Sequence, residues 1–101
     1  MDPKNNIDHA NIAQLTDFFK ALSDSTRLKI VYYLQAAKKP RCVGAISKHI
    51  NVSQSATSQH LRILRQSNLV ISERKGYHIH YEINSEQLEA FITQLQGLLK
   101  K

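Results

Sequence analysis

The chain has 101 residues, 42% of them hydrophobic, and a formal net charge of +6, which together fit one domain with a modest core rather than two domains. It contains no run of about 18 apolar residues and no apolar segment in its polar N-terminal stretch (1–12), which excludes a membrane span and a secretory signal. Its one cysteine, Cys42, excludes an internal disulfide and fits a reducing compartment, so we expect a cytoplasmic protein.

Two helices are predicted in the first third of the chain. Apolar residues recur at helical spacing over residues 7–22 and form one stripe. Ser23 or Asp24 can cap a second helix, which runs to about Ala37 and supplies core positions. The segment 38–40, Lys-Lys-Pro, ends this helix because the residue before a proline is pushed out of helical geometry.

Two short helices joined by a tight turn are predicted next. The first covers about 43–50, and Asn51-Val52 connects it to the second. Ser53 is an N-cap candidate for the second helix, which continues to about Gln66. Asn68 suits the left-handed conformation that closes a helix.

A β-hairpin and a last helix complete the chain. The stretches 69–74 and 77–83 alternate in polarity, and Gly76 between them supplies the positive φ of a tight turn. Ser85 can cap a helix through about Leu99. The order of four helices, a hairpin and a helix predicts a winged helix-turn-helix, a mainly α fold with a small β-hairpin.

The positive charge is confined to the middle of the chain. Residues 27–75 carry ten Lys and Arg against Glu73 alone, whereas the segments 1–26 and 76–101 are each slightly negative. A polyanion is the expected partner of such a distribution, because neutralised phosphates release counterions. On charge alone, a solvated basic surface is an equally good interpretation.

The second helix of the turn-linked pair has the composition of a helix that enters the major groove of DNA. Residues 54–59 offer small or polar side chains, and Gln, Ser and Thr can all pair with base edges. The charges at 74–75 lie at the hairpin tip, from which they can reach the backbone or the minor groove. The predicted DNA-binding residues are Gln54, Ser55, Thr57, Ser58, Gln59, Arg62, Arg74 and Lys75.

Three segments resemble the ArsR/SmtB family of repressors. Residues 52–64 (VSQSATSQHLRIL) resemble that family's recognition helix, residues 20–30 (KALSDSTRLKI) its ALxDxTRLxIL segment, and residues 74–76 its wing. The resemblance covers about 15–84 and implies a repressor that binds a palindromic operator in double-stranded DNA as a homodimer. His60 matches a common histidine of that family, and we expect a mainly structural role for it because its helical position turns it towards the protein body. The side chains that the resemblance places in the groove are Gln54, Ser55, Thr57 and Ser58.

The apolar stripes of the first and last helices fit the implied dimer. A chain this short has little core to spare, and two such stripes need a partner. We expect 1–101 to form a single winged helix-turn-helix domain with dimerisation helices at 1–22 and 85–101, although both stripes could pack inside one subunit. The predicted dimerisation residues are Leu15, Phe18, Phe19, Leu88, Phe91, Ile92, Leu95 and Leu99.

The metal sites usual in the resembled family have no full counterpart here. One uses paired cysteines in a string like CVC, and this chain has Cys42 followed by Gly44 at the second position. Another uses Asp and His on the last helix, and 85–101 contains neither. One thiolate alone is not a soft-metal site, so no metal or other cofactor is expected. The alternative of a metal- or redox-responsive repressor using Cys42 stays open, and weaker candidate ligands are His9, His78 and His80.

Two other classes of protein fit the sequence less well. An enzyme is not expected, because Cys42 has no histidine three or four residues away and the chain has no glycine-rich phosphate loop. A protein-interaction winged helix would present an apolar or acidic face at 54–59, and the sequence has neither there. A sequence-specific transcriptional regulator without a membrane partner is therefore predicted, with its operator and inducer left open.

Overall fold

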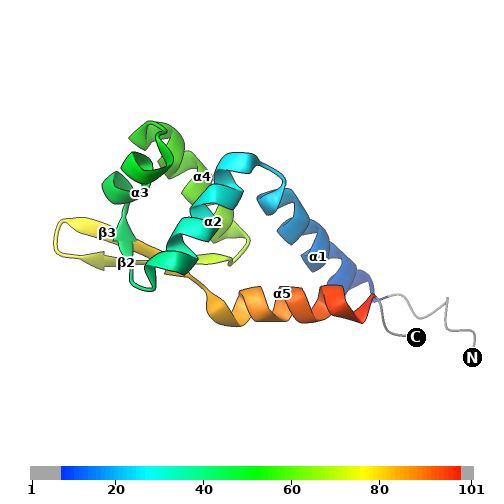
Figure 1. Ribbon diagram of the computed structural model, residues 1–101. Coiled ribbons are helices and arrows are strands. Elements are labelled where there is room, and N and C mark those ends of the chain that lie inside the picture. Colours follow the sequence, from blue (N-terminus) through cyan, green and yellow to red (C-terminus); the bar gives the residue numbers. More distant parts are fainter. Residues whose placement is uncertain (1–7, 99–101) are drawn as a thin grey trace, which may run out of the picture.

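The computed structural model describes residues 8–98, which form five helices and a small sheet whose strands come from between α2 and α3 and from between α4 and α5 (Figure 1). The elements are α1 (His9–Leu22), α2 (Ser25–Ala37), β1 (Arg41–Cys42), α3 (Val43–Ile50), α4 (Gln54–Gln66), β2 (Val70–Lys75), β3 (His78–Ile83) and α5 (Ser85–Gly97). Helices α1 and α5 lie side by side at one end, while α3 and the hairpin occupy the other (Figure 1). This order confirms the predicted winged helix-turn-helix.

Side-chain caps explain where the helices begin. Asp24 Oδ1 accepts the backbone N–H groups of Thr26 and Arg27 at 2.8 and 3.1 Å, and Ser53 Oγ accepts that of Ala56 at 3.1 Å. Each cap satisfies N–H groups that the first turn leaves without helical partners. The same role at α1 falls to Asp8, so this helix begins two residues later than expected.

The cap of α5 differs from the prediction. Asn84, not Ser85, has the extended conformation of a cap, and its side chain accepts the N–H of Gln87 at 3.3 Å. Asn and Ser can both cap a helix, so residue type alone does not show which of the two adjacent residues is the cap. The extended backbone of Asn84 makes it the cap.

Left-handed residues end three of the helical segments. Lys38 follows α2 with φ 56°, Asn51 follows α3 with φ 59°, and Asn68 lies just beyond α4 with φ 62°. Asparagine tolerates this conformation well, which confirms the expectation for Asn68. Helix α2 therefore ends at the left-handed Lys38, before Pro40 is reached.

The sheet is antiparallel with strand order β1-β3-β2. Strands β2 and β3 form the predicted hairpin, closed by Gly76 with φ 65°. Strand β1 was not predicted, because two residues are too short to show alternation. Its pairing of Arg41 with Tyr81, and of Cys42 with His80, ties the start of α3 to the hairpin.

The core lies where α2, α3, α4 and the start of β2 meet. Its fully buried residues include Ile30, Ile46, Leu61, Leu64 and Val70. No helix within residues 8–98 is both long and apolar enough to cross a membrane.

The apolar stripes of α1 and α5 divide between the core and the surface. Phe18 and Phe91 are 2% and 5% exposed and pack edge to face, with ring centroids 4.8 Å apart. Both were predicted to contact a second subunit, and for these two the prediction is wrong because they pair inside one subunit. Leu99, another predicted contact, lies outside the described residues.

Candidate nucleic-acid interface

The exposed face of α4 carries five of the predicted DNA-binding side chains. Gln54, Ser55, Ser58, Gln59 and Arg62 are all exposed. Their spacing of three or four residues between neighbouring turns places them along one side of the helix. The opposite side is buried in the core, so α4 is held with a polar surface outward.

Thr57 does not belong to this face. It is 0% exposed, and its Oγ1 donates to the backbone carbonyl of Ser53 at 2.8 Å. The prediction that Thr57 faces the groove is therefore wrong. Its position supplied a signal, because Thr57 lies four and seven residues before Leu61 and Leu64 and so shares their buried stripe.

The first turn of α4 lies against α3. A Cβ added to Gly44 would be 3.6 Å from Gln54 Nε2 and 4.0 Å from Cys42 Sγ. The Gln54 amide is therefore next to the start of α3 as well as to solvent. Ser53 caps α4 by accepting one of its first N–H groups. The remaining N-terminal N–H groups and the helix dipole favour an anion at this end.

Arg27 connects three helices behind this face. Its Nε donates to the carbonyl of Ala21 at 2.6 Å, and its Nη2 donates to that of Lys20 at 3.3 Å, both at the end of α1. Its Nη1 lies 3.3 Å from His60 Nδ1 on α4. The half-buried His60 thus faces the protein body, as its helical position predicted.

Asp24 completes the same network. His60 Nδ1 lies 4.0 Å from Asp24 Oδ1. The pKa of the Asp24 carboxyl is lowered, first by the N–H of Arg27, against the raising effect of burial, and then by the N–H of Thr26 and the charges of His60 and Arg27. The carboxylate is therefore held in its charged form while it caps α2.

The hairpin presents cations next to a large aromatic side chain. Arg74 and Lys75 are exposed at the end of β2, and Tyr77 in the turn is 99% exposed. Sequence reasoning missed Tyr77, although an aromatic residue directly after a turn glycine was a visible signal. Arg65 is less free, because its Nη1 donates to Ser72 Oγ at 3.3 Å and links α4 to β2.

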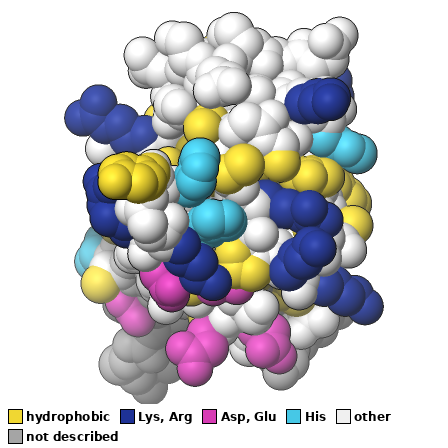
Figure 2. Space-filling model, turned by 90° about the vertical axis from the view of Figure 1, so that its left-hand side faces the viewer, with side chains coloured by type: hydrophobic (Ala, Val, Ile, Leu, Met, Phe, Trp, Pro, Cys, Tyr) yellow, Lys and Arg dark blue, Asp and Glu magenta, His cyan; other side chains and the backbone are white. Residues whose placement is uncertain are grey.

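The charges are separated over the surface. Figure 2 views the end of the molecule that carries α3 and the hairpin, and its Lys and Arg side chains lie mainly along the two flanks of this face. The Asp and Glu side chains gather toward the lower edge, away from the uncharged polar surface at the top (Figure 2). An extended polyanion would therefore meet cations on both sides of a polar surface.

An apolar surface lies at the other end of the molecule. Phe19 and Ile92 are 49% and 44% exposed, and the half-buried residues of the same stripes are Leu15, Leu88 and Leu95. Ile12 and Leu98, which belong to the predicted stripes but not to the predicted dimerisation residues, are also exposed. These exposed and half-buried apolar side chains of α1 and α5 are called the α1–α5 face below.

The candidate sensor residues are scattered. Cys42 is half-buried at the start of α3, opposite His80 in the sheet, while His78 and His9 are exposed elsewhere. Within residues 8–98, no three His, Cys, Asp or Glu side chains are grouped so that they could hold a metal ion.

Comparison with known proteins agrees with this geometry. A sequence model described as a bacterial regulatory protein of the arsR family matches residues 24–72. The chain is 34% identical over 87 residues to the transcriptional repressor SdpR of Bacillus subtilis (strain 168), covering 86% of this chain and 94% of SdpR. It is 38% identical over 76 residues to the arsenical resistance operon repressor of the same organism, covering 75% and 71%.

A solved structure extends the likeness to three dimensions. The homodimeric winged helix-turn-helix DNA-binding domain Mb0332 from Mycobacterium bovis, described as a possible ArsR-family regulator, superposes with a TM-score of 0.73. It is 28% identical in sequence, and the superposition covers 89% of this chain and 82% of that one.

Proposed function

Because this chain belongs to the ArsR family of bacterial regulatory proteins, we propose that it is a transcriptional repressor that binds a palindromic operator as a homodimer. The observation that carries the proposal is the exposed polar face of α4, held outward beside the cationic hairpin. The protein acts in the cytoplasm, where its DNA is accessible, and performs no catalysis.

Two groups of side chains contact different parts of the DNA. Ser55 and Ser58, with Gln54 and Gln59 beside them, read base edges in the major groove, which is wide enough for a helix with short polar side chains. The cations Arg62, Arg74 and Lys75 contact phosphates and fix the register without reading sequence. Thr57 takes no direct part.

The α1–α5 face holds the two subunits together. Phe19 and Ile92 supply exposed apolar surface there, as a two-fold interface requires. Such a dimer presents its two α4 helices roughly 34 Å apart, which matches one turn of the duplex and hence two half-sites of a palindrome. The repressor does not sense a metal through paired cysteines, because Gly44 stands where the second thiolate of such a site would be needed.

A pair of matched double variants tests the readout. We expect Ser55→Ala with Ser58→Ala to weaken binding to DNA from upstream of the chain's own gene by about ten-fold or more, since a good base contact is worth about 1–3 kcal/mol. Nonspecific DNA should bind as before, because the cations are unchanged. The control is Ser25→Ala with Ser85→Ala, two exposed serines in the first turns of α2 and α5.

The measurement is fluorescence anisotropy with labelled specific and nonspecific duplexes. Equal affinity of the unchanged protein for every duplex would overturn the proposal of a sequence-specific repressor. Equal losses in the test and control variants would remove α4 from the site of base recognition.

A further inference from the structure

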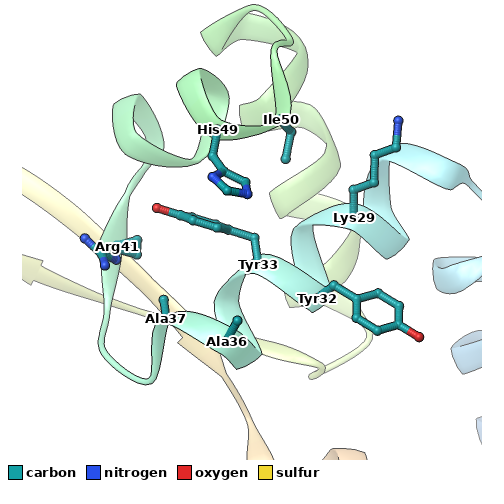
Figure 3. Close-up of a pocket in the computed structure, with 8 residues that line it drawn as sticks. All are labelled: Lys29, Tyr32, Tyr33, Ala36, Ala37, Arg41, His49 and Ile50. Carbon is teal, nitrogen blue, oxygen red and sulfur yellow. The ribbon is translucent and has the colours of Figure 1, made fainter.

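A cavity of about 830 Å³ opens between α2 and α3, away from the face of α4 (Figure 3). None of its described lining residues belongs to α4 or to the hairpin. The cavity is bounded by Lys29, Tyr32, Tyr33, Ala36, Ala37, Arg41, His49 and Ile50. Its size lies within the range of pockets that hold small molecules.

A flat aromatic surface forms one wall. The ring of Tyr33 stacks on that of His49, with centroids 4.1 Å apart and planes inclined by 23° (Figure 3). The small side chains of Ala36 and Ala37 leave room in front of this pair. A planar ring is the group that gains most from contact with such a wall.

The charged groups of the cavity are cationic. Arg41 and Lys29 lie on opposite sides of the Tyr33 ring, and none of the described lining residues is acidic (Figure 3). The Arg41 guanidinium carbon is 6.0 Å from the Tyr33 ring centroid, and its Nε is buried without a hydrogen-bond partner among residues 8–98. This Nε is too enclosed for a ligand to reach, but the charge of the guanidinium group as a whole, with that of Lys29, would stabilise an anion in the cavity.

We propose that this cavity binds a small planar aromatic anion, with its ring on the face of Tyr33 that His49 does not cover and its carboxylate on Arg41. The proposal does not depend on DNA binding, and its test uses the free protein. The position is nevertheless suited to control, because the cavity walls include α3, which packs directly on α4. A ligand that binds the free and DNA-bound forms unequally shifts DNA affinity by the same factor.

Calorimetry of the full chain with 2-naphthoate tests the site, and the neutral 2-naphthamide is the matched ligand. We expect one naphthoate to bind per chain about ten-fold more tightly than the amide, because the charge-assisted bond to Arg41 is available only to the anion. Arg41→Gln should remove that preference. Lys48→Gln, which deletes a neighbouring exposed charge of α3 outside the cavity, should leave it unchanged.

A second variant keeps the test independent of β1, where Arg41 also pairs with Tyr81. His49→Ala removes the exposed ring that stacks on Tyr33 and holds it in place, and it should weaken both ligands by a similar factor, since both stack on Tyr33. Absence of binding to the unchanged protein at millimolar naphthoate would overturn the proposal. So would equal affinity for the amide, or an unaltered preference in folded Arg41→Gln.

Discussion

The hairpin cations provide a quantitative test of DNA binding through its dependence on salt. Each proposed protomer brings three exposed cations to the phosphates, namely Arg62, Arg74 and Lys75. If each makes one contact, about six contacts per dimer give a slope of log affinity against log salt of about −5. Affinity for the operator should then fall by about 1,000-fold between about 50 and 200 mM salt.

The double variant Arg74→Gln with Lys75→Gln removes the hairpin contacts in both subunits. Only the two contacts from Arg62 remain, so the slope should fall to about −2 and the loss over the same salt range to about ten-fold. The control Lys20→Gln with Lys39→Gln deletes the same charge from exposed positions at the end of α1 and in the α2–β1 turn. It should keep a slope near that of the unchanged protein.

The assay is anisotropy of a labelled operator duplex at four or more salt concentrations, with circular dichroism to verify that each variant is folded. The reasoning is refuted if the hairpin variant keeps the full slope. It is equally refuted if the control loses as much slope as the hairpin variant, because net charge rather than position would then explain binding.

Three further predictions concern the scaffold. Arg27→Met should lower the free energy of unfolding by about 2 kcal/mol, measured in urea at fixed protein concentration, because two carbonyls of α1 and His60 lose a charged partner; an unchanged midpoint would contradict it. Phe19→Asp with Ile92→Asp should convert the dimer into a species of 11.5 kDa in light scattering, and persistence of the dimer mass would remove the α1–α5 face. The lowered pKa of Asp24 means that its contribution to stability is complete above its ordinary pKa and is lost as pH falls below about 4, so Asp24→Asn should flatten the acid limb of stability against pH; an identical acid limb would contradict this.

Local signals explain why most helices could be predicted. Capping by Asp24 and Ser53, and the left-handed Asn68, depend on the nearest few residues, and each is visible in the chain. The strand β1 depends instead on pairing with a hairpin some forty residues away, which no local pattern encodes. The cavity could not be predicted for the same reason, because its residues Tyr33 and Arg41 come from different elements.

The errors at the two surfaces have a common cause. Periodicity identifies an apolar stripe but not what covers it, so Phe18 and Phe91 were assigned to a partner although they pack on each other. The opposite error was made for Thr57. Its hydroxyl was expected to be exposed, but it is buried and donates to the backbone carbonyl of Ser53. The residue types were enough to predict that α4 has a polar face. Which residues belong to that face depends on how α4 packs in three dimensions.

The network around Arg27 gives the proposed repressor its geometric precision. A palindrome is read only if the two α4 helices stay at a fixed separation, yet in the proposed dimer the subunits meet through α1 and α5, not through α4. Arg27 bonds to the end of α1 and contacts His60 on α4, while Asp24 caps α2 beside them. Because these contacts join the dimerisation helix to the recognition helix directly, a change that loosens Arg27 should reduce specificity for half-site spacing before it abolishes nonspecific binding.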